Sequence, residues 1–182
     1  SPSISGYLTI NPDFATVEAD REQVNLTRFE LHLPEKRNFF IEGNDAYQQR
    51  IRLFYSRRIA DIYAGAKLYG KTGQFEISAL TAQTRKEEES KASANFSVFR
   101  LRLDILRSSN IGFLAANKRV DGINQGVMGL DTNLNFTTTF TFTGQLALSY
   151  KGNNKTDLAF FLRPSYDSRT FHIHIRYTHL GD

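Results

Sequence analysis

The chain has 182 residues, 40% of them hydrophobic, and this length and composition fit one folded domain covering 1–182. Its 23 Lys and Arg residues exceed the 19 Asp and Glu residues, but these charges are spread along the sequence, which does not predict a nucleic-acid partner. The chain contains no cysteine, so disulfides, thiolate metal sites and cysteine nucleophiles are excluded.

Residues 11–47 form the first predicted unit, a polar insert of mixed charge. Its acidic and basic side chains are interspersed, and only residues 28–33 alternate between polar and apolar positions as a strand does. We expect this insert to fold into the lumen of the barrel that the later strands predict, where ion pairs with the strand faces would fix its position. The residues expected to make these pairs are Glu18, Asp20, Glu35, Arg37, Arg57 and Arg58.

Residues 50–180 are predicted to form antiparallel strands, because polar and apolar side chains alternate along most of this region. The alternation is strongest at 62–69, 99–105, 128–142 and 171–177, and weaker at 74–81, 111–117, 144–150 and 158–166. Short turn sequences separate these segments, which favours hairpins between neighbouring strands. The turn sequences lie at 70–73, 107–110, 121–122, 151–154 and 167–169, and a longer charged loop is expected at 85–93.

The length of the strands favours a particular fold class. As a single strand, residues 128–142 would extend over about 50 Å, well beyond the usual strand of a globular sheet. Long strands with one apolar face and short turns predict an all-β fold: an antiparallel transmembrane (outer-membrane) β-barrel, or a portion of one, with about 8–10 strands. The alternative is a soluble antiparallel barrel, in which the apolar faces point inward around a core or a ligand.

Four basic residues share the polar faces of the predicted strands. They are Lys67, Arg100, Arg102 and Arg176. In a closed barrel they would line the lumen, where they would favour anions or acidic sugars. The competing interpretation is that they pair with the acids of residues 13–42.

Residues 65–72 match the phosphate-loop pattern G-x-x-x-x-G-K-[ST]. That motif binds a nucleotide only where a strand ends before the first glycine and a helix begins at the lysine. Here the alternation runs through the motif and another strand starts at Phe75. Gly65 to Thr72 is therefore predicted to be a strand and a turn, and no nucleotide is expected to bind.

Two histidines form the only other spacing that suggests a site. His172 and His174 lie two residues apart on one strand face, which can place two metal ligands, but no third ligand is identifiable. The polar face simply continues through Arg176, so neither a metal nor another cofactor is expected. Catalysis is not predicted either, because spacing selects no carboxylate pair in the insert and no G-x-S-x-G motif occurs.

The first 80 residues also resemble a known family. The resemblance is carried by the segments 11–14, 17–20, 24–31, 34–37, 39–42, 55–59 and 65–73. They are similar to the signature of a bacterial domain of unknown function, the family numbered 5916, which commonly follows a carbohydrate-binding module resembling family 9. The resemblance implies an outer-membrane β-barrel of unestablished activity and identifies no catalytic residue. No such module precedes Ser1 and the family's barrel continues beyond the last residue, so we expect an excerpt of a larger barrel.

The patterns and the family resemblance together predict a bacterial outer-membrane β-barrel module that acts as a scaffold, an anchor or a plugged conduit. The resemblance implies, in addition, a link to carbohydrate handling at the cell surface. The expected partners are outer-membrane lipid and a carbohydrate-binding module in the parent chain, with no nucleic acid and no nucleotide. The alternative is a soluble, lipocalin-like protein that binds a ligand. A component of a glycoside-processing enzyme is a third interpretation, which depends on the associated module alone.

Overall fold

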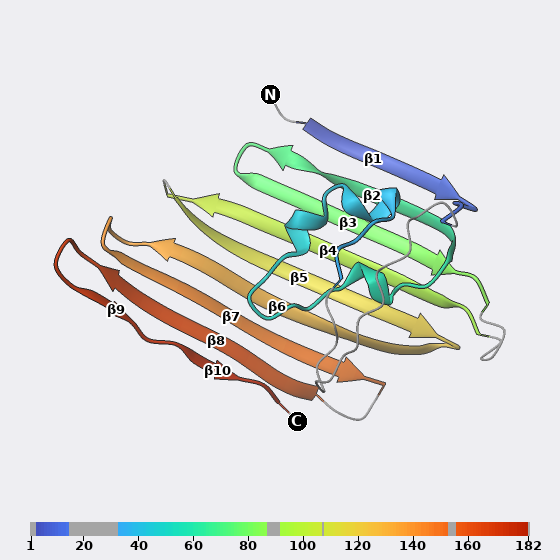
Figure 1. Cartoon of the computed structure of the whole chain (residues 1–182). Coiled ribbons are helices and arrows are strands. Elements are labelled where there is room, and N and C mark those ends of the chain that lie inside the picture. Colours follow the sequence, from blue (N-terminus) through green and yellow to red (C-terminus); the bar gives the residue numbers. More distant parts are fainter. Residues whose placement is uncertain (1–2, 15–32, 87–91, 107, 153–155, 182) are drawn as a thin grey trace.

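The structure, a computed structural model, describes residues 3–14, 33–86, 92–106, 108–152 and 156–181. These residues form one antiparallel sheet of ten strands, in which consecutive strands pair from β1 to β8 and the short β9 and β10 both pair with β8 (Figure 1). The strands are β1 (Ser3–Ile10), β2 (Ile62–Thr72), β3 (Phe75–Thr84), β4 (Ala94–Ile105), β5 (Ser109–Val120), β6 (Ile123–Asn135), β7 (Phe140–Lys151), β8 (Thr156–Asp167), β9 (His172–His174) and β10 (Tyr177–His179). Short helices between β1 and β2 are α1 (Asn38–Ile41), η1 (Asn44–Tyr47) and η2 (Ser56–Arg58).

The sheet is open. β1 forms one edge and β9 with β10 forms the other, and within the described residues no ladder joins these two edges. The predicted all-β antiparallel fold is therefore confirmed, whereas closure into a barrel is not observed. None of the described helices is long and apolar enough to span a membrane.

The prediction of one long strand at 128–142 is wrong, because the chain turns back within it. β6 ends at Asn135 and β7 begins at Phe140. The register places Leu134 opposite Phe142, so even-numbered residues stay on the same face before and after the turn. The alternation therefore continues through the hairpin, and a period of two residues cannot reveal where the threonine-rich turn lies.

A proline explains a second difference, at the C-terminal edge. The sequence predicts one strand at 171–177, but β9 ends at His174 and β10 begins at Tyr177. Between them, the Ile175 amide donates to the Pro164 carbonyl on β8 at a distance of 3.2 Å. Proline has no N–H with which to return this bond, so the ladder is interrupted at this position.

Strand β1 has no counterpart among the predicted strands, although its sequence carries the signal. Ile4, Leu8 and Ile10 alternate with polar side chains, and β1 pairs with β2 along its whole length. The polar insert thus begins directly after β1, the first strand of the sheet. The chain that follows it forms β2, which pairs with β1.

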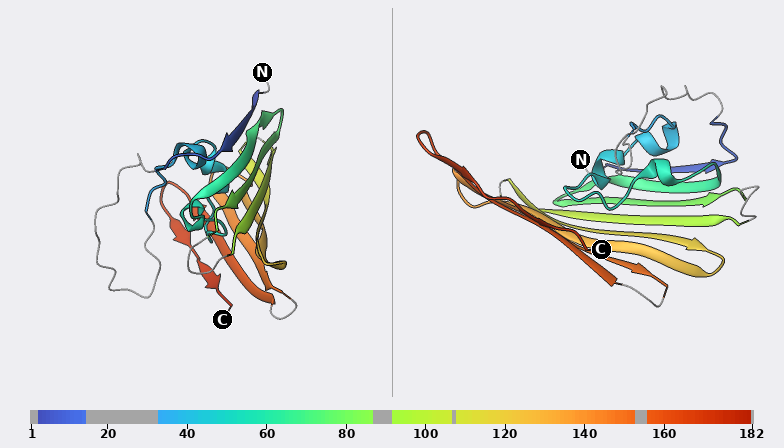
Figure 2. Two further views of the ribbon diagram at one scale, coloured as in Figure 1. Left: turned by 90° about the vertical axis from the view of Figure 1, so that its right-hand side faces the viewer. Right: turned by 60° about the horizontal axis from the view of Figure 1, so that its bottom comes forward.

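The two faces of the sheet differ in what covers them. Residues 33–61, which we call the inner segment, carry the short helices and pack on one face, the inner face (Figure 2). The buried residues of the resulting core are Phe40, Tyr47, Ile59, Ile62, Leu80, Ala82, Val98 and Leu114. No described element covers the opposite face, the outer face.

The β5–β6 hairpin turns at the predicted position, through two residues with positive φ. Asp121 has a φ of 48° and Gly122 a φ of 83°, values that suit glycine because a Cβ is strained there. We expect Gly122→Ala to lower the free energy of unfolding by about 1 kcal/mol, and Asp121→Gly to change it by less than about 0.5 kcal/mol. Denaturant titration followed by circular dichroism measures both, and equal losses would show that the turn conformation is not the cause.

Candidate functional site

The inner segment is attached to the inner face by side chains of the sheet that bind its backbone. Lys67 of β2 donates from Nζ to the carbonyl oxygens of Phe39, at 2.6 Å, and Glu42, at 2.8 Å. The ring centres of Tyr7, Phe39 and Tyr69 lie 5.1–5.4 Å from the same ammonium group. A buried cation requires such partners, and here carbonyl dipoles and ring faces provide them.

Gly65 allows the inner segment to approach β2 closely. A Cβ at this position would lie 2.7 Å from Cζ of Phe39, so any larger residue would displace that ring. Gly65 also begins the phosphate-loop match, yet β2 runs through the motif and Gly73 turns the chain directly into β3. Residues 65–72 therefore lack the helix N-terminus on which phosphate binding depends.

Arg100 of β4 forms the second attachment. Its guanidinium group makes a two-bond ion pair with the carboxylate of Asp131 on β6, with Nη2 and Oδ2 2.8 Å apart, and its Nε donates to the Ala46 carbonyl at 3.2 Å. Gln49 donates to the same carboxylate, so the inner segment contacts both members of the pair. Gly112, on the intervening strand β5, leaves room for this pair, because a Cβ there would lie 2.6 Å from Nη1 of Arg100.

Gln145 of β7 makes the third attachment. Its Nε2 donates to the Ile51 carbonyl at 2.7 Å, and its Oε1 accepts from the Ile51 amide at 2.6 Å. The side-chain amide of Gln145 thus satisfies both the N–H and the C=O group of Ile51, which lies outside regular secondary structure. A neighbouring strand would satisfy these groups in the same way.

Within the inner segment, an ion pair holds the irregular chain together. Arg37 Nη2 lies 2.8 Å from Glu35 Oε2, and the guanidinium also donates to the carbonyl oxygens of Ser56 and Ile59. The Ser56 hydroxyl donates to Glu35 at 2.7 Å. Burial raises the pKa of Glu35, but hydrogen bonds from Arg37 and Ser56 together with the Arg37 charge outweigh it and hold the pKa below its usual value.

Three of the four basic residues expected to share the lumen lie together on the inner face. Lys67 and Arg100 bind the inner segment, while Arg102 pairs with Glu76 of the neighbouring strand β3. Arg176 is exposed between β9 and β10, at the edge of the sheet. The described geometry therefore engages Lys67, Arg100 and Arg102 in structural contacts.

The ion pairs expected between the insert and the strands take a different form. Glu18 and Asp20 lie outside the described residues. Glu35 and Arg37 pair with each other inside the inner segment. The described acidic partner of Arg100 is Asp131 of β6, and that of Arg102 is Glu76 of β3, so both lie on strands and not in residues 13–42.

The two arginines of η2 lie within the inner segment. Arg57 donates to the Pro34 carbonyl at 3.0 Å, which is again a contact within the segment. Arg58 is exposed and lines a cavity that opens beside the segment. Both arginines thus belong to the inner segment itself, and ion pairs between them and the strands stay a prediction.

Sequence reasoning did not identify Asp131 and Gln145, which lie directly opposite each other on β6 and β7. Alternation places both on the inner face, but it does not show which neighbours they meet. Register decides this: Gly112 lies opposite Asp131, so the guanidinium of Arg100 reaches the carboxylate diagonally across β5. The signal available in the sequence is an acidic side chain among neutral ones on the polar face of residues 128–142.

The histidines lie at the C-terminal edge beside an aspartate. Oδ1 of Asp167 is 2.9 Å from Nδ1 of His172 and 3.4 Å from Nε2 of His174, and all three side chains are exposed. In the part of the chain that the structure describes, no group of three or more His, Cys, Asp or Glu residues is arranged to hold a metal ion.

A cavity of about 640 Å³ opens on the inner face beside the inner segment. Its apolar lining consists of Leu53, Phe54, Phe96, Val98, Ala116 and Val127. Its charged and polar side chains include Arg58, Lys118, Gln125, Lys151 and Asp157. The volume lies within the range of small-molecule sites in proteins.

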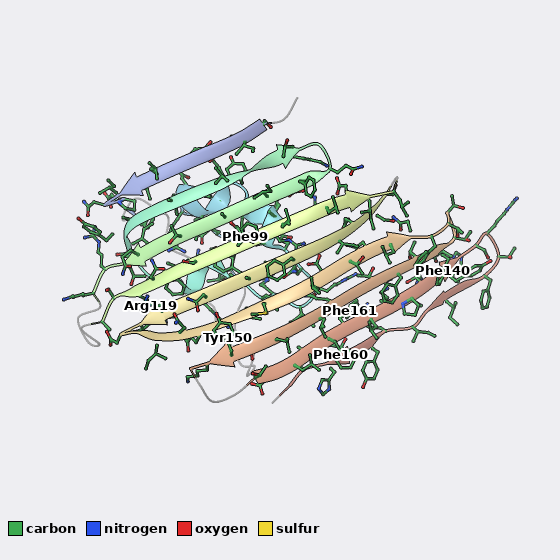
Figure 3. All side chains as sticks on the ribbon, turned by 180° about the vertical axis from the view of Figure 1, so that it is seen from behind. Phe99, Arg119, Phe140, Tyr150, Phe160 and Phe161 are labelled. Atoms are coloured by element: carbon green, nitrogen blue, oxygen red, sulfur yellow. The ribbon has the colours of Figure 1, made fainter. Side chains whose placement is uncertain are left out.

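The outer face is apolar from β2 to β8. Figure 3 shows it from behind the inner segment, with Phe99 and Phe160 among its side chains. The large hydrophobic side chains of this face that are 40–53% exposed include Leu68, Phe75, Phe99, Ile111, Met128, Leu130, Leu146, Leu158 and Leu162. They continue from strand to strand in register, as where Leu146 lies opposite both Leu130 and Phe160.

Residues 7–74 match the sequence profile of a family described as a domain of unknown function (DUF5916). The match begins in β1, includes the inner segment and ends just after β2, so it contains Lys67 and its partners but not Arg100, Asp131 or Gln145. It supports the resemblance found in the first 80 residues. No curated protein and no solved structure matches the chain.

The Arg100–Asp131 pair provides a test of how firmly the inner segment is attached. Arg100 is 3% exposed, so Arg100→Met would leave the Asp131 carboxylate buried without its cation. We expect a loss of about 3 kcal/mol in the free energy of unfolding, part of which Asp131→Asn in the same chain would recover. A double-mutant cycle by denaturant titration measures this coupling, and a loss below about 0.5 kcal/mol in the single variant would contradict the attachment.

The Glu35 carboxylate makes the inner segment sensitive to acid. Because its pKa is lowered in the folded protein, its contribution to stability is present above the unfolded pKa and is lost as the pH falls through the folded value. We expect hydrogen exchange of the inner segment, corrected for intrinsic rates, to speed up relative to β4–β6 below about pH 4. Glu35→Gln would abolish this dependence; its persistence would assign the effect to other carboxylates.

Proposed function

We propose that this sheet is the lipid-facing wall of a membrane-embedded β-barrel module of the bacterial outer-membrane type, in which the inner segment is a fixed plug. The outer face would contact lipid, and the inner face would enclose the inner segment. The module would act as a scaffold or anchor in the membrane more than as an open conduit, because side chains of β2, β4 and β7 hold the inner segment in place.

The uncovered outer face is the observation that carries this proposal. A continuous apolar surface of this kind on a water-soluble monomer marks an interaction site, because its exposure to water is unfavourable. Lipid chains can cover such a face without supplying hydrogen bonds, provided that the strands satisfy each other's backbone groups. From β2 to β8 the strands do so through continuous antiparallel ladders.

The strands are long enough for this role. β2 to β8 contain between 10 and 13 residues each. A tilted strand needs about 9–11 residues to cross the hydrocarbon core of a bilayer. Each of these strands is therefore long enough to cross the hydrocarbon core of a bilayer, with few residues beyond that length.

The outer face also changes character along the strands. At the end that contains the β2–β3 and β6–β7 turns, exposed aromatic side chains gather: Phe75, Phe136, Phe140, Tyr166 and Phe171. At the opposite end the β5–β6 turn is flanked by the polar, exposed Arg119 and Asn124. Exposed aromatic side chains at the boundary of an apolar band are typical of transmembrane strands, which carry such a girdle at each interface. The aromatic group at the end with the β2–β3 and β6–β7 turns supports the proposal at one of these two boundaries.

The open edges set a condition on the proposal. Unpaired backbone N–H and C=O groups of an edge strand cost several kcal/mol each in lipid, so β1 and the β8–β10 edge require further strands beside them. We therefore propose that the described sheet is a portion of a larger, closed ladder. A link to carbohydrate at the cell surface comes only from the family resemblance and adds nothing to this argument.

The soluble alternative places the apolar face inward, around a core or a ligand. In the structure the inner segment packs against the opposite face, where Lys67, Arg100 and Gln145 bind its backbone. A lipocalin-like arrangement would need a second covering for the outer face, which no described element provides. The geometry therefore favours the membrane proposal over the soluble one.

A charge placed on the outer face separates the two functions. Leu130 is 53% exposed at the middle of β6, and Thr81 is exposed toward the polar end of β3 on the same face. In lipid, we expect Leu130→Lys to cost about 2–4 kcal/mol of stability and the control Thr81→Lys less than about 1 kcal/mol. Urea titration of protein refolded into phospholipid vesicles measures both.

Refolding with and without detergent completes the test. The membrane proposal predicts a β-rich circular dichroism spectrum only with detergent, and an unboiled band that migrates differently from the boiled one on a gel. A monodisperse β-rich protein in plain buffer, in which Leu130→Lys has no effect on stability, would overturn the proposal and support the soluble alternative.

A further inference from the structure

We infer that the cavity beside the inner segment binds a small amphipathic organic anion, one that joins a carboxylate, phosphate or sulfonate group to an apolar ring or short chain. This inference does not depend on the proposed membrane function, because the cavity lies on the inner face and uses none of the outer-face residues. It also differs from the basic lumen that the sequence predicts, since Lys67, Arg100 and Arg102 are engaged in structural contacts.

The base of the cavity provides an apolar surface. Ala116 of β5 lies opposite Val127 of β6, and this pair forms a row of the inner face with Ser149 of β7. Val98 of β4 extends this row beside Ala116, and Phe96 of β4 and Leu53 of the inner segment also line the cavity. An aromatic ring or a short alkyl chain placed here would lose its contact with water against apolar side chains.

The next row toward the end of the strands provides the charge. Lys118 of β5 lies opposite Gln125 of β6, and Gln125 lies opposite Lys151 of β7, so the lysines flank the amide on one face. Two strand spacings place the two lysine backbones about 10 Å apart. Among the described residues neither lysine makes an ion pair, and Nζ of Lys118 lies 5.3 Å from the Phe96 ring centre, above the apolar wall.

The balance of charge selects an anion. Among the described residues, the cavity is lined by the basic side chains of Arg58, Lys118 and Lys151 and by one acid, Asp157. Because the cations lie beside the apolar row, a ligand that satisfies both must carry its negative charge at one end and its apolar part at the other. Gln125, between the lysines, can donate to an anionic oxygen from its amide.

Phenyl phosphate is a suitable probe, because it has this shape and its phosphorus nucleus reports binding directly. We would titrate it against the full chain, folded in dodecyl maltoside or in buffer, and follow the phosphorus NMR signal. We expect saturable binding, and at least about ten-fold weaker binding of inorganic phosphate, which cannot use the apolar row. Raising the ionic strength should weaken both.

Two variants and a matched control test the residues. Lys118→Met with Lys151→Met keeps the aliphatic stems but removes both charges, and Val127→Phe fills the apolar row. We expect each to weaken binding of phenyl phosphate at least about ten-fold, whereas Arg119→Met should change it less than about two-fold. Arg119 is a basic residue at the same end of the sheet but on the outer face (Figure 3).

The outcomes decide the inference in either direction. Selective loss in the lysine and valine variants, with unchanged circular dichroism, would support a site at this cavity. The inference is overturned if phenyl phosphate shows no saturable binding up to about 10 mM, or if the lysine variant binds it with wild-type affinity. It is also overturned if Arg119→Met weakens binding as much as the lysine variant does, because that would indicate general charge attraction.

Discussion

The need to satisfy backbone hydrogen bonds in an irregular segment governs this structure. The inner segment contains only short helices, so many of its N–H and C=O groups lack partners from regular secondary structure. Lys67, Arg100 and Gln145, on three separate strands, supply those partners from the sheet. The inner face is polar at these positions because the segment above it requires polar side chains.

The same constraint separates the two faces. Side chains alternate along a strand, so positions committed to the inner segment leave the intervening positions for the other side. Those positions carry Leu130, Leu146 and Phe160 in one continuous row across β6, β7 and β8. A single sheet thus combines a covered face, on which polar side chains lie among core residues, with an apolar, uncovered one. The membrane proposal follows from that asymmetry.

Small residues determine where the covering segment and the ion pairs fit. Gly65 admits the Phe39 ring beside Lys67, and Gly112 admits the Arg100 guanidinium beside Asp131. In both places the missing side chain creates room for a long-range contact, and the contact is made by groups far apart in the sequence. The cavity beside the inner segment arises where this covering ends, so its lysines are left facing an apolar row.

The sequence by itself determined the strand class, the two-faced pattern and most turns, because these depend on a period of two residues and on local turn chemistry. It did not determine the hairpin within 128–142, since an even register preserves the alternation through the turn. Nor did it determine the partners of Arg100, because these depend on the register of β4, β5 and β6. Only the tertiary structure brings Arg100, Asp131 and Ala46 together, because strand register and the path of the inner segment are set by packing between distant parts of the chain.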